Sequence, residues 1–267
     1  MKNTFKLAFL ACVASLALSA CGEKEPTVIT PEKIATADYQ KVLYYDITAT
    51  WCPPCGQYGI PDFKAALAAD TASVGFSCHP SNNNDVLFSP IAVELDNLLY
   101  PPSGASGIPS FGEGINGYEQ SMQQCKTAGA ARKAAGNVLA GLGVRQTVSG
   151  DTLKIDARVK FLKADAGNKI YALGVYILQD GIAQQQAGAA TNPFVHDHLI
   201  VGKATLGYGE TIKSGPVTAT DNIGKSYIFV KNKANMVMSK MYAAVVLWEV
   251  NAAGKPITFI NVNKVKL

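Results

Sequence analysis

The sequence predicts an α/β domain followed by an all-β antiparallel sandwich. Three observations support this fold class. Between residues 38 and 140, apolar runs of strand length alternate with segments of helical spacing. From about residue 138 onward, strand-like runs are separated by turn signals such as Ser149-Gly150-Asp151 and Ala253-Gly254-Lys255. The 267 residues are enough for one or two domains, each with its own core.

The N-terminus has the pattern of a secretory signal. Lys2 and Lys6 precede an uncharged apolar run over residues 7–18, which is shorter than the roughly 20 residues that a membrane-spanning helix needs. The run ends in Leu18-Ser19-Ala20-Cys21, which resembles the lipobox of bacterial lipoproteins. We therefore expect residues 1–20 to be removed and Cys21 to carry a lipid that anchors the protein to a membrane. Ordinary signal cleavage, with Cys21 left free, is the alternative.

Residues 21–37 are expected to form a tether, because they carry charges and prolines without a hydrophobic period. Removal of Lys2 and Lys6 with the signal leaves 22 basic against 20 acidic residues, from 24 against 20 in the whole chain. This balance predicts no particular partner. No basic stripe with interleaved aromatic residues is present, so nucleic-acid binding is not predicted.

The elements of the first half begin with a strand over residues 41–47 that leads directly to Cys52. A helix over 62–69 and a second strand over 72–78 follow, and this order predicts a crossover unit with parallel strands. The remaining elements, in order, are a helix over 90–100, a strand introduced by 107–111 and a helix over 118–137.

The second half is expected to consist of strands joined by short turns. The expected strands cover residues 151–162, 169–178, 226–230, 241–250 and 256–262. The change from helical to strand-like pattern places the domain boundary near residues 138–145, so we assign 38–140 to the α/β domain and 141–267 to the sandwich.

Two cysteines three positions apart, Cys52 and Cys55, are the main candidates for chemistry. Disulfide exchange needs an exposed thiolate with a lowered pKa and a second thiol that resolves the mixed disulfide. A strand-to-helix junction favours the thiolate through unpaired N–H groups and the helix dipole, and Pro53 and Pro54 fit the first helical turn. Cys52 is the predicted nucleophile and Cys55 the predicted resolving thiol.

Two other interpretations of this motif remain. The cysteines can form an inert structural disulfide, or Cys-Pro-x-Cys-Gly can act as half of a zinc site. A structural zinc needs four ligands, and only the scattered Cys78, His79 and Cys125 could complete the set. We therefore expect redox chemistry at the cysteines, with no metal and no cofactor besides the disulfide itself.

Several motifs resemble thioredoxin-like proteins, in particular the membrane-tethered TlpA-like members. Trp51-Cys52-Pro53-Pro54-Cys55 has the W-C-x-x-C form of that family, Asp46 lies six positions before Cys52, and Gly107-Ile108-Pro109 is similar to the family's G-I-P segment. The resemblance covers about residues 38–137. It implies a central mixed sheet with flanking helices.

The resemblance also assigns roles to individual residues. Asp46 would be a buried carboxylate that deprotonates Cys55, and Pro109 would follow a cis bond and face the cysteines. Separately from the resemblance, Trp51 is expected to shield the cysteines and to offer an exposed edge to a client, and Trp51 and Ile108 are the predicted substrate-binding residues. The family's helix-kinking proline falls one place late, at Pro61. The sequence therefore leaves the register of the first helix open.

Two segments of the second half, 175–182 and 194–200, resemble the Omp28-related outer-membrane lipoproteins of Bacteroidetes. That family joins a thioredoxin-like domain to a β-sandwich. The resemblance implies an outer-membrane lipoprotein of a Gram-negative bacterium, facing either the periplasm or the exterior.

The other cysteines and histidines have weaker signals. Cys78 and Cys125 form either a second disulfide or two buried thiols, and the even count slightly favours the disulfide. His196 and His198 would share a face on a strand. Without a nearby third ligand we expect them to be structural, at the interface between the two halves.

Together these features predict a lipid-anchored thiol–disulfide oxidoreductase of the cell envelope. Its partners would be exported proteins with disulfides, and reduction of these clients would require a membrane electron donor. The rival hypothesis is an outer-envelope adhesion or binding protein in which the Cys52–Cys55 disulfide is structural.

Overall fold

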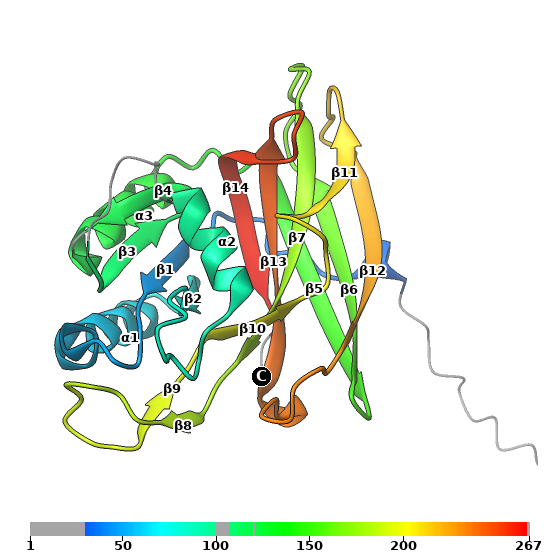
Figure 1. Cartoon of the computed structure of the whole chain (residues 1–267). Helices are drawn as coiled ribbons and strands as arrows, with labels where there is room; N and C mark the ends of the chain where they lie inside the picture. Colours follow the sequence, from blue (N-terminus) through cyan, green and yellow to red (C-terminus); the bar gives the residue numbers. More distant parts are fainter. Residues whose placement is uncertain (1–29, 100–106, 120, 266–267) are drawn as a thin grey trace, which may run out of the picture.

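A nine-stranded mixed sheet runs through both halves of the chain in the computed structural model, which describes residues 30–99, 107–119 and 121–265 (Figure 1). Its strand order is β14-β13-β7-β10-β2-β1-β3-β4, and β11 also pairs with β7. A second sheet of three strands, in the order β12-β6-β5, packs against part of it, and β8 and β9 form a separate hairpin.

The first half contains the predicted crossover unit. β1 (Leu43–Ile47) and β2 (Val74–Cys78) pair in parallel, and α1 (Ile60–Ala69) connects them. β3 (Ser110–Glu113) then pairs antiparallel with β1. The other elements are α2 (Pro90–Leu99), β4 (Asn116–Glu119) and α3 (Met122–Ala134).

One element of this half was predicted wrongly. The expected helix over 118–137 begins only at Met122, because residues 116–119 form β4 and pair with β3. The turn between these strands contains Gly114, whose φ of 64° suits a glycine. This Gly-Ile turn is not one of the common hairpin signals, so the sequence pattern did not reveal it.

The described part of the second half is made of strands, as predicted, although the sequence identified only five of them. β5 (Ala140–Ser149), β6 (Thr152–Phe161) and β12 (Asn222–Val230) form the three-stranded sheet. The other strands are β7 (Ile170–Gln179), β8 (Ile182–Gln184), β9 (Phe194–His196), β10 (Leu199–Lys203), β11 (Glu210–Ser214), β13 (Met241–Val250) and β14 (Pro256–Lys264).

The main sheet does not end where the sequence pattern changes near residue 140. β10 pairs in parallel with β2 at Leu199 and Ser77, and the Ser77 N–H donates to the His198 carbonyl at 2.8 Å. β7 and β13 continue the sheet from β10. The two halves therefore share backbone hydrogen bonds as well as side-chain contacts.

β7 and β13 are buried on both faces, which explains why their sequences run apolar without alternation. One face packs on the three-stranded sheet through Tyr171, Leu173, Val175, Ile177, Met241, Ala243, Val245 and Leu247. The other face shares a core with β1, β2 and α2 through Ala172, Tyr176, Leu178, Tyr242, Ala244, Val246, Trp248 and Val250.

The described part of the expected tether, residues 30–37, packs on the three-stranded sheet. Arg158 on β6 donates to the Ile34 carbonyl at 2.8 Å, and Ala37 forms a β-bridge with Leu142 on β5. These residues therefore belong to the folded body. Cys21 and the rest of the tether lie outside the described residues.

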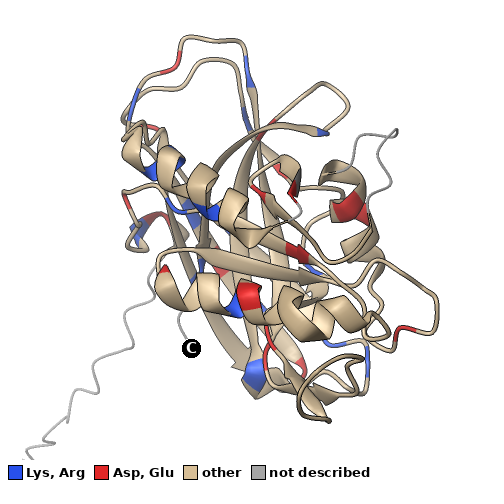
Figure 2. Ribbon diagram, turned by 90° about the vertical axis from the view of Figure 1, so that its left-hand side faces the viewer, with Lys and Arg blue, Asp and Glu red and all other residues tan. Residues whose placement is uncertain are grey.

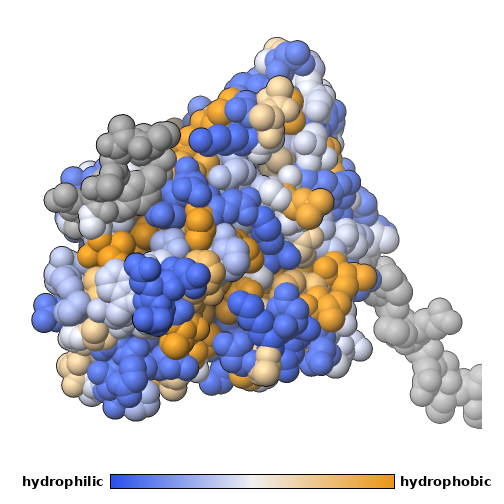
Figure 3. All heavy atoms as spheres, viewed as in Figure 1, coloured by the Kyte–Doolittle hydropathy of each residue, from blue (hydrophilic) through white to orange (hydrophobic). Residues whose placement is uncertain are grey.

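The surface carries charges of both signs. Figure 2 shows Lys and Arg interspersed with Asp and Glu over the ribbon. On the face seen in Figure 3, hydrophobic groups form small patches between hydrophilic ones. Within the described ranges, no helix has the length and hydropathy needed to cross a bilayer.

Candidate active site

Cys52 and Cys55 form a disulfide at the junction between β1 and the first helix, with their Cα atoms 5.3 Å apart. β1 ends at Ile47, a short loop follows, and helical geometry begins at Pro53. The cysteines are deeply placed, since Cys52 is 3% exposed and Cys55 is 0% exposed. From the sequence we expected an exposed nucleophile, whereas the structure buries Cys52.

The Cys52 sulfur occupies the capping position of this helix. The Cys55 backbone N–H lies 3.2 Å from Cys52 Sγ, in the geometry of a donor to that sulfur. Pro53 and Pro54, the two residues between them, have no N–H, so this N–H is the first one available in the helix. A sulfur in this place as a thiolate would gain from the donated hydrogen bond and from the helix dipole.

A π-helical turn over Cys55–Gly59 settles the register that the sequence left open. A π turn contains one extra residue relative to an α turn, which accounts for Pro61 falling one place late. Gly59 is needed within this turn, because a Cβ there would lie 2.6 Å from Pro109 Cβ. The helix start and the Pro109 loop are thus in direct contact.

The Ile108–Pro109 peptide bond is cis, as the resemblance implied. The Ile108 carbonyl oxygen lies 3.6 Å from Cys52 Sγ, so this loop faces the disulfide. Trp51, which directly precedes Cys52, is 44% exposed. Ile108 is partly buried against the cysteines.

Asp46 is buried on β1, between Ser77 of β2 and Phe111 of β3. Among the described residues, neither of its carboxylate oxygens has a hydrogen-bond partner. Burial raises the pKa of Asp46 to about 8, because an ionised carboxylate is poorly solvated there. By strand alternation its side chain lies on the same face as Tyr44, which packs with α1 residue Phe63. A carboxylate with this pKa can accept a proton near neutral pH.

A second buried aspartate, Asp85, was not singled out from the sequence. It accepts hydrogen bonds from the Thr50 N–H at 3.1 Å, the Thr50 hydroxyl at 3.0 Å and the Leu87 N–H at 2.9 Å. His79 Nδ1 lies 2.8 Å from the same carboxylate. Burial alone would raise the pKa of Asp85, but these partners, His79 first, hold it below the ordinary value. Asp85 thereby fixes the loop that carries Cys52.

His196 and His198 do not share a strand face. His196 ends β9, is buried, and its ring lies 5.7 Å from that of His79. Burial, followed by the nearby His79, lowers the pKa of His196 to about 4. His198 lies beyond the strand with φ of 60°, and its Nδ1 is 2.7 Å from the Tyr242 hydroxyl. Both histidines lie between the two halves, as expected.

The second disulfide suggested by the even cysteine count does not form. Cys78 and Cys125 are free and buried. Cys78 belongs to the core that β1 and β2 share with α2, whereas Cys125 on α3 packs with Tyr44 on the opposite face of the sheet. The sheet itself separates the two thiols. In the described ranges, no three His, Cys, Asp or Glu side chains are grouped as a metal site.

The loop between β8 and β9, residues 185–193, covers the cysteine motif. Its Gln186 is buried and donates to the carbonyls of Ala49 and Cys52, both at 3.1 Å. In Figure 1 this hairpin extends from the second half of the chain to the side of α1. No sequence signal connected these residues with the motif, since Gln186 and Cys52 are 134 positions apart.

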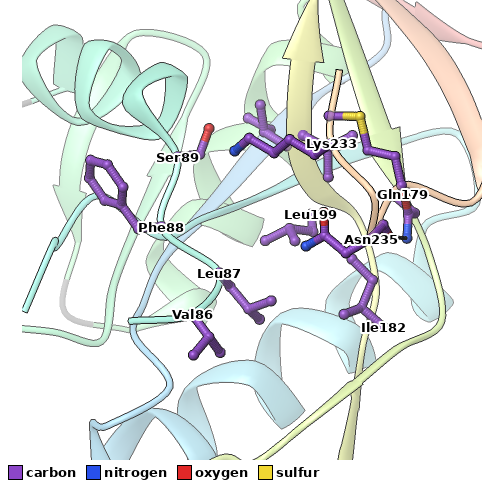
Figure 4. Close-up of a pocket in the computed structure, with 12 residues that line it drawn as sticks. Val86, Leu87, Phe88, Ser89, Gln179, Ile182, Leu199, Lys233 and Asn235 are labelled. Carbon is purple, nitrogen blue, oxygen red and sulfur yellow. Dashed lines mark hydrogen bonds between the residues drawn. The ribbon is translucent and has the colours of Figure 1, made fainter. Parts of the chain in front are cut away.

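A small pocket lies at the base of this hairpin. Figure 4 shows Val86 and Leu87 facing Ile182 and Asn235 across it. Its volume of about 30 Å³ is that of roughly one water molecule, so it offers no room for an organic substrate.

Comparisons with known proteins show a shared fold. HBP35 of Porphyromonas gingivalis superposes with a TM-score of 0.68 at 16% identity, covering 87% of this chain and 77% of that chain. A protein of Agrobacterium tumefaciens superposes with a TM-score of 0.52, also at 16% identity, covering 86% of this chain and 95% of that chain. No family model and no curated protein matches the sequence.

Proposed function

We propose that this chain is a thioredoxin-like thiol–disulfide oxidoreductase whose redox centre is Cys52–Cys55. The observation that carries the proposal is the disulfide at the start of a helix, with the Cys55 N–H directed at Cys52 Sγ and the cis Ile108–Pro109 bond facing it. The crossover unit followed by β3, β4 and α3 supports the thioredoxin-like assignment. The sandwich assignment of the second half is supported by its two packed sheets.

The reaction would proceed as two exchanges. In the reduced protein, the Cys52 thiolate attacks one sulfur of a client disulfide, which forms a mixed disulfide and releases the first client thiolate. Asp46 takes the Cys55 proton, and the Cys55 thiolate attacks Cys52 Sγ. This step forms the Cys52–Cys55 disulfide and releases the second client thiolate. The client gains two electrons, which a membrane donor must later return to the protein.

The cellular setting is part of the same proposal. The Lys2 to Cys21 signal supports a lipid anchor, and the clients would then be exported proteins with disulfides at the outer membrane. The fold shared with HBP35, a Bacteroidetes protein, supports a relation to proteins of that group.

The first test is a reduction potential. The chain from residue 22 onward would be equilibrated in graded glutathione buffers, and alkylated Cys52 and Cys55 counted by mass spectrometry. A potential between about −120 and −270 mV is expected for an exchange catalyst. A disulfide that stays oxidised below about −300 mV would contradict the proposal. With a model disulfide substrate, Asp46→Asn should slow turnover about 100-fold.

A trapping variant tests the order of attack. Cys55→Ser should accumulate mixed disulfides between Cys52 and envelope proteins, because the resolving thiol is absent. Cys52→Ser is the matched control and should accumulate none. Equal trapping by both variants would contradict the assigned roles.

One observation favours the rival function. Both cysteines are buried beneath residues 185–193, which suits a structural disulfide in a binding protein. In that case the double variant Cys52→Ser, Cys55→Ser would retain full function in cells. Loss of function with retained folding would exclude the rival.

A further inference from the structure

The covering loop, defined as residues 185–193, contacts the backbone on which the disulfide is mounted. The Ala187 N–H donates to the Thr50 carbonyl at 2.8 Å. The Gln186 side-chain amide donates to the carbonyls of Ala49 and Cys52. The loop therefore occupies three backbone acceptors around Cys52, the carbonyls of Ala49, Thr50 and Cys52, and packs beside the buried cysteine.

Two glycines allow this close approach, one on each side of the contact. A Cβ at Gly56 would lie 2.1 Å from the Ala187 carbonyl oxygen, and a Cβ at Gly188 would lie 2.1 Å from the Pro53 carbonyl oxygen. Gly188 also has φ of 76°. Any side chain at either position would push the loop away from the helix start.

The covering loop is held internally and at its base. Asn192 exchanges two hydrogen bonds with the Gln186 backbone, at 2.8 and 3.1 Å. Lys64 on α1 donates to the Val195 carbonyl and pairs with Asp197, both at 2.7 Å. The hydrogen bonds from the covering loop to the motif come from Gln186 and Ala187. Movement of the loop away from the motif breaks these bonds while the Lys64 contacts still hold the end of the hairpin.

We propose that the covering loop gates the redox centre and that Gln186 is the residue that determines access to Cys52. This inference rests on the proposed exchange function but concerns access, not redox chemistry. With the loop closed, the disulfide is protected from thiols. When Gln186 releases the two carbonyls, a client or reductant reaches Cys52. The second half of the chain thereby selects reaction partners that can displace the loop.

The test is the rate at which dithiothreitol reduces the oxidised protein, followed by acid quenching, alkylation and mass spectrometry. One reagent thiolate attacks Cys52 Sγ and releases the Cys55 thiolate. The second thiolate of the same reagent then forms the cyclic disulfide and releases Cys52, so the protein gains two electrons. Gln186→Ala should react about tenfold faster, because the closed state loses hydrogen bonds worth about 1.4 kcal/mol.

The chain contains matched controls. Gln185 is exposed and adjacent, so Gln185→Ala should keep the rate of the parent protein. Gly188→Ala is a second gate variant and should also react about tenfold faster by displacing the loop. Gly207→Ala is its control, because Gly207 also has positive φ, at 50°, but a Cβ there has nothing within 4 Å.

The outcomes separate the two proposals. If both gate variants keep folded spectra and reduce within twofold of the parent rate, the gate is refuted, whatever the reduction potential is. Accelerated reduction with a potential below about −300 mV would support the gate while refuting the catalytic function. Accelerated reduction with a potential in the catalytic range would support both.

Discussion

Two buried aspartates are associated with the cysteine motif. Asp46 lies six positions before Cys52 in the sequence, and Asp85 contacts Thr50. The two carboxylates differ in their hydrogen bonds and in the direction of their pKa shifts. Asp46 on β1 has no hydrogen-bond partner in the part of the chain that the structure describes, and burial raises its pKa to about 8. Asp85, in the loop after β2, is surrounded by donors from Thr50, Leu87 and His79, and its pKa is lowered despite burial.

The comparison shows that the pKa of a buried carboxylate depends on its hydrogen-bond partners as well as on its burial. Asp85 stays ionised at neutral pH and holds the Cys52 loop through charge-assisted hydrogen bonds. Asp46 is poised to bind or release a proton near neutral pH, which is the property required of the proposed base. Asp85 therefore has a structural role, whereas Asp46 is the base in the proposed exchange.

The largest effect is expected from Asp85→Ala. The substitution leaves the buried His79 and the Thr50 donors without an acceptor, so the free energy of unfolding should fall by about 3 to 5 kcal/mol. Urea denaturation measures this change. Asp62→Ala, at an exposed position of α1, is the control and should stay within about 0.5 kcal/mol. If Asp85→Ala changed the free energy of unfolding as little as the control does, Asp85 would have no structural role.

Asp46→Asn should increase the free energy of unfolding, and the size of this increase should depend on pH. Because the folded pKa is about 8 and the unfolded value is near 3.8, the folded protein binds more protons between these values and loses stability as pH rises through them. The variant lacks this loss. It should be more stable than the parent by on the order of 2 to 4 kcal/mol at pH 8 and nearly equal at pH 4. A pH-independent difference would contradict the raised pKa.

His196→Leu tests the electrostatics beside Asp85. The folded pKa of His196 is about 4 and the ordinary value is 6.5, so the parent loses stability as pH falls from 6.5 towards 4. The variant should avoid about 1 kcal/mol of this loss per pH unit. Parallel stability curves for the two proteins would show that His196 does not titrate in this way.

The smallest effect is expected from a pair of threonine variants. Thr50→Val removes the hydroxyl donor to Asp85 and should cost about 1 kcal/mol. Thr48→Val is the matched control, because the buried Thr48 hydroxyl has no partner within the described ranges, and it should be neutral or slightly stabilising. Equal costs at the two positions would mean that the Asp85 contacts add little.

Much of the site was predictable because its parts are local. The strand before Cys52, the prolines that begin the helix and the Asp46 position follow from short-range pattern and resemblance. The free state of Cys78 and Cys125 was not predictable. An even count cannot show that a sheet lies between two thiols.

By itself, the sequence determined the order of most strands and helices and the cysteine motif, because hydrophobic period and turn residues act over a few positions. Only the tertiary structure decided that β10 joins β2 into one sheet and that Gln186 covers Cys52. Those contacts join segments more than 100 residues apart. Their stability comes from burial and hydrogen bonds that exist only after both halves have packed, and no local pattern encodes them.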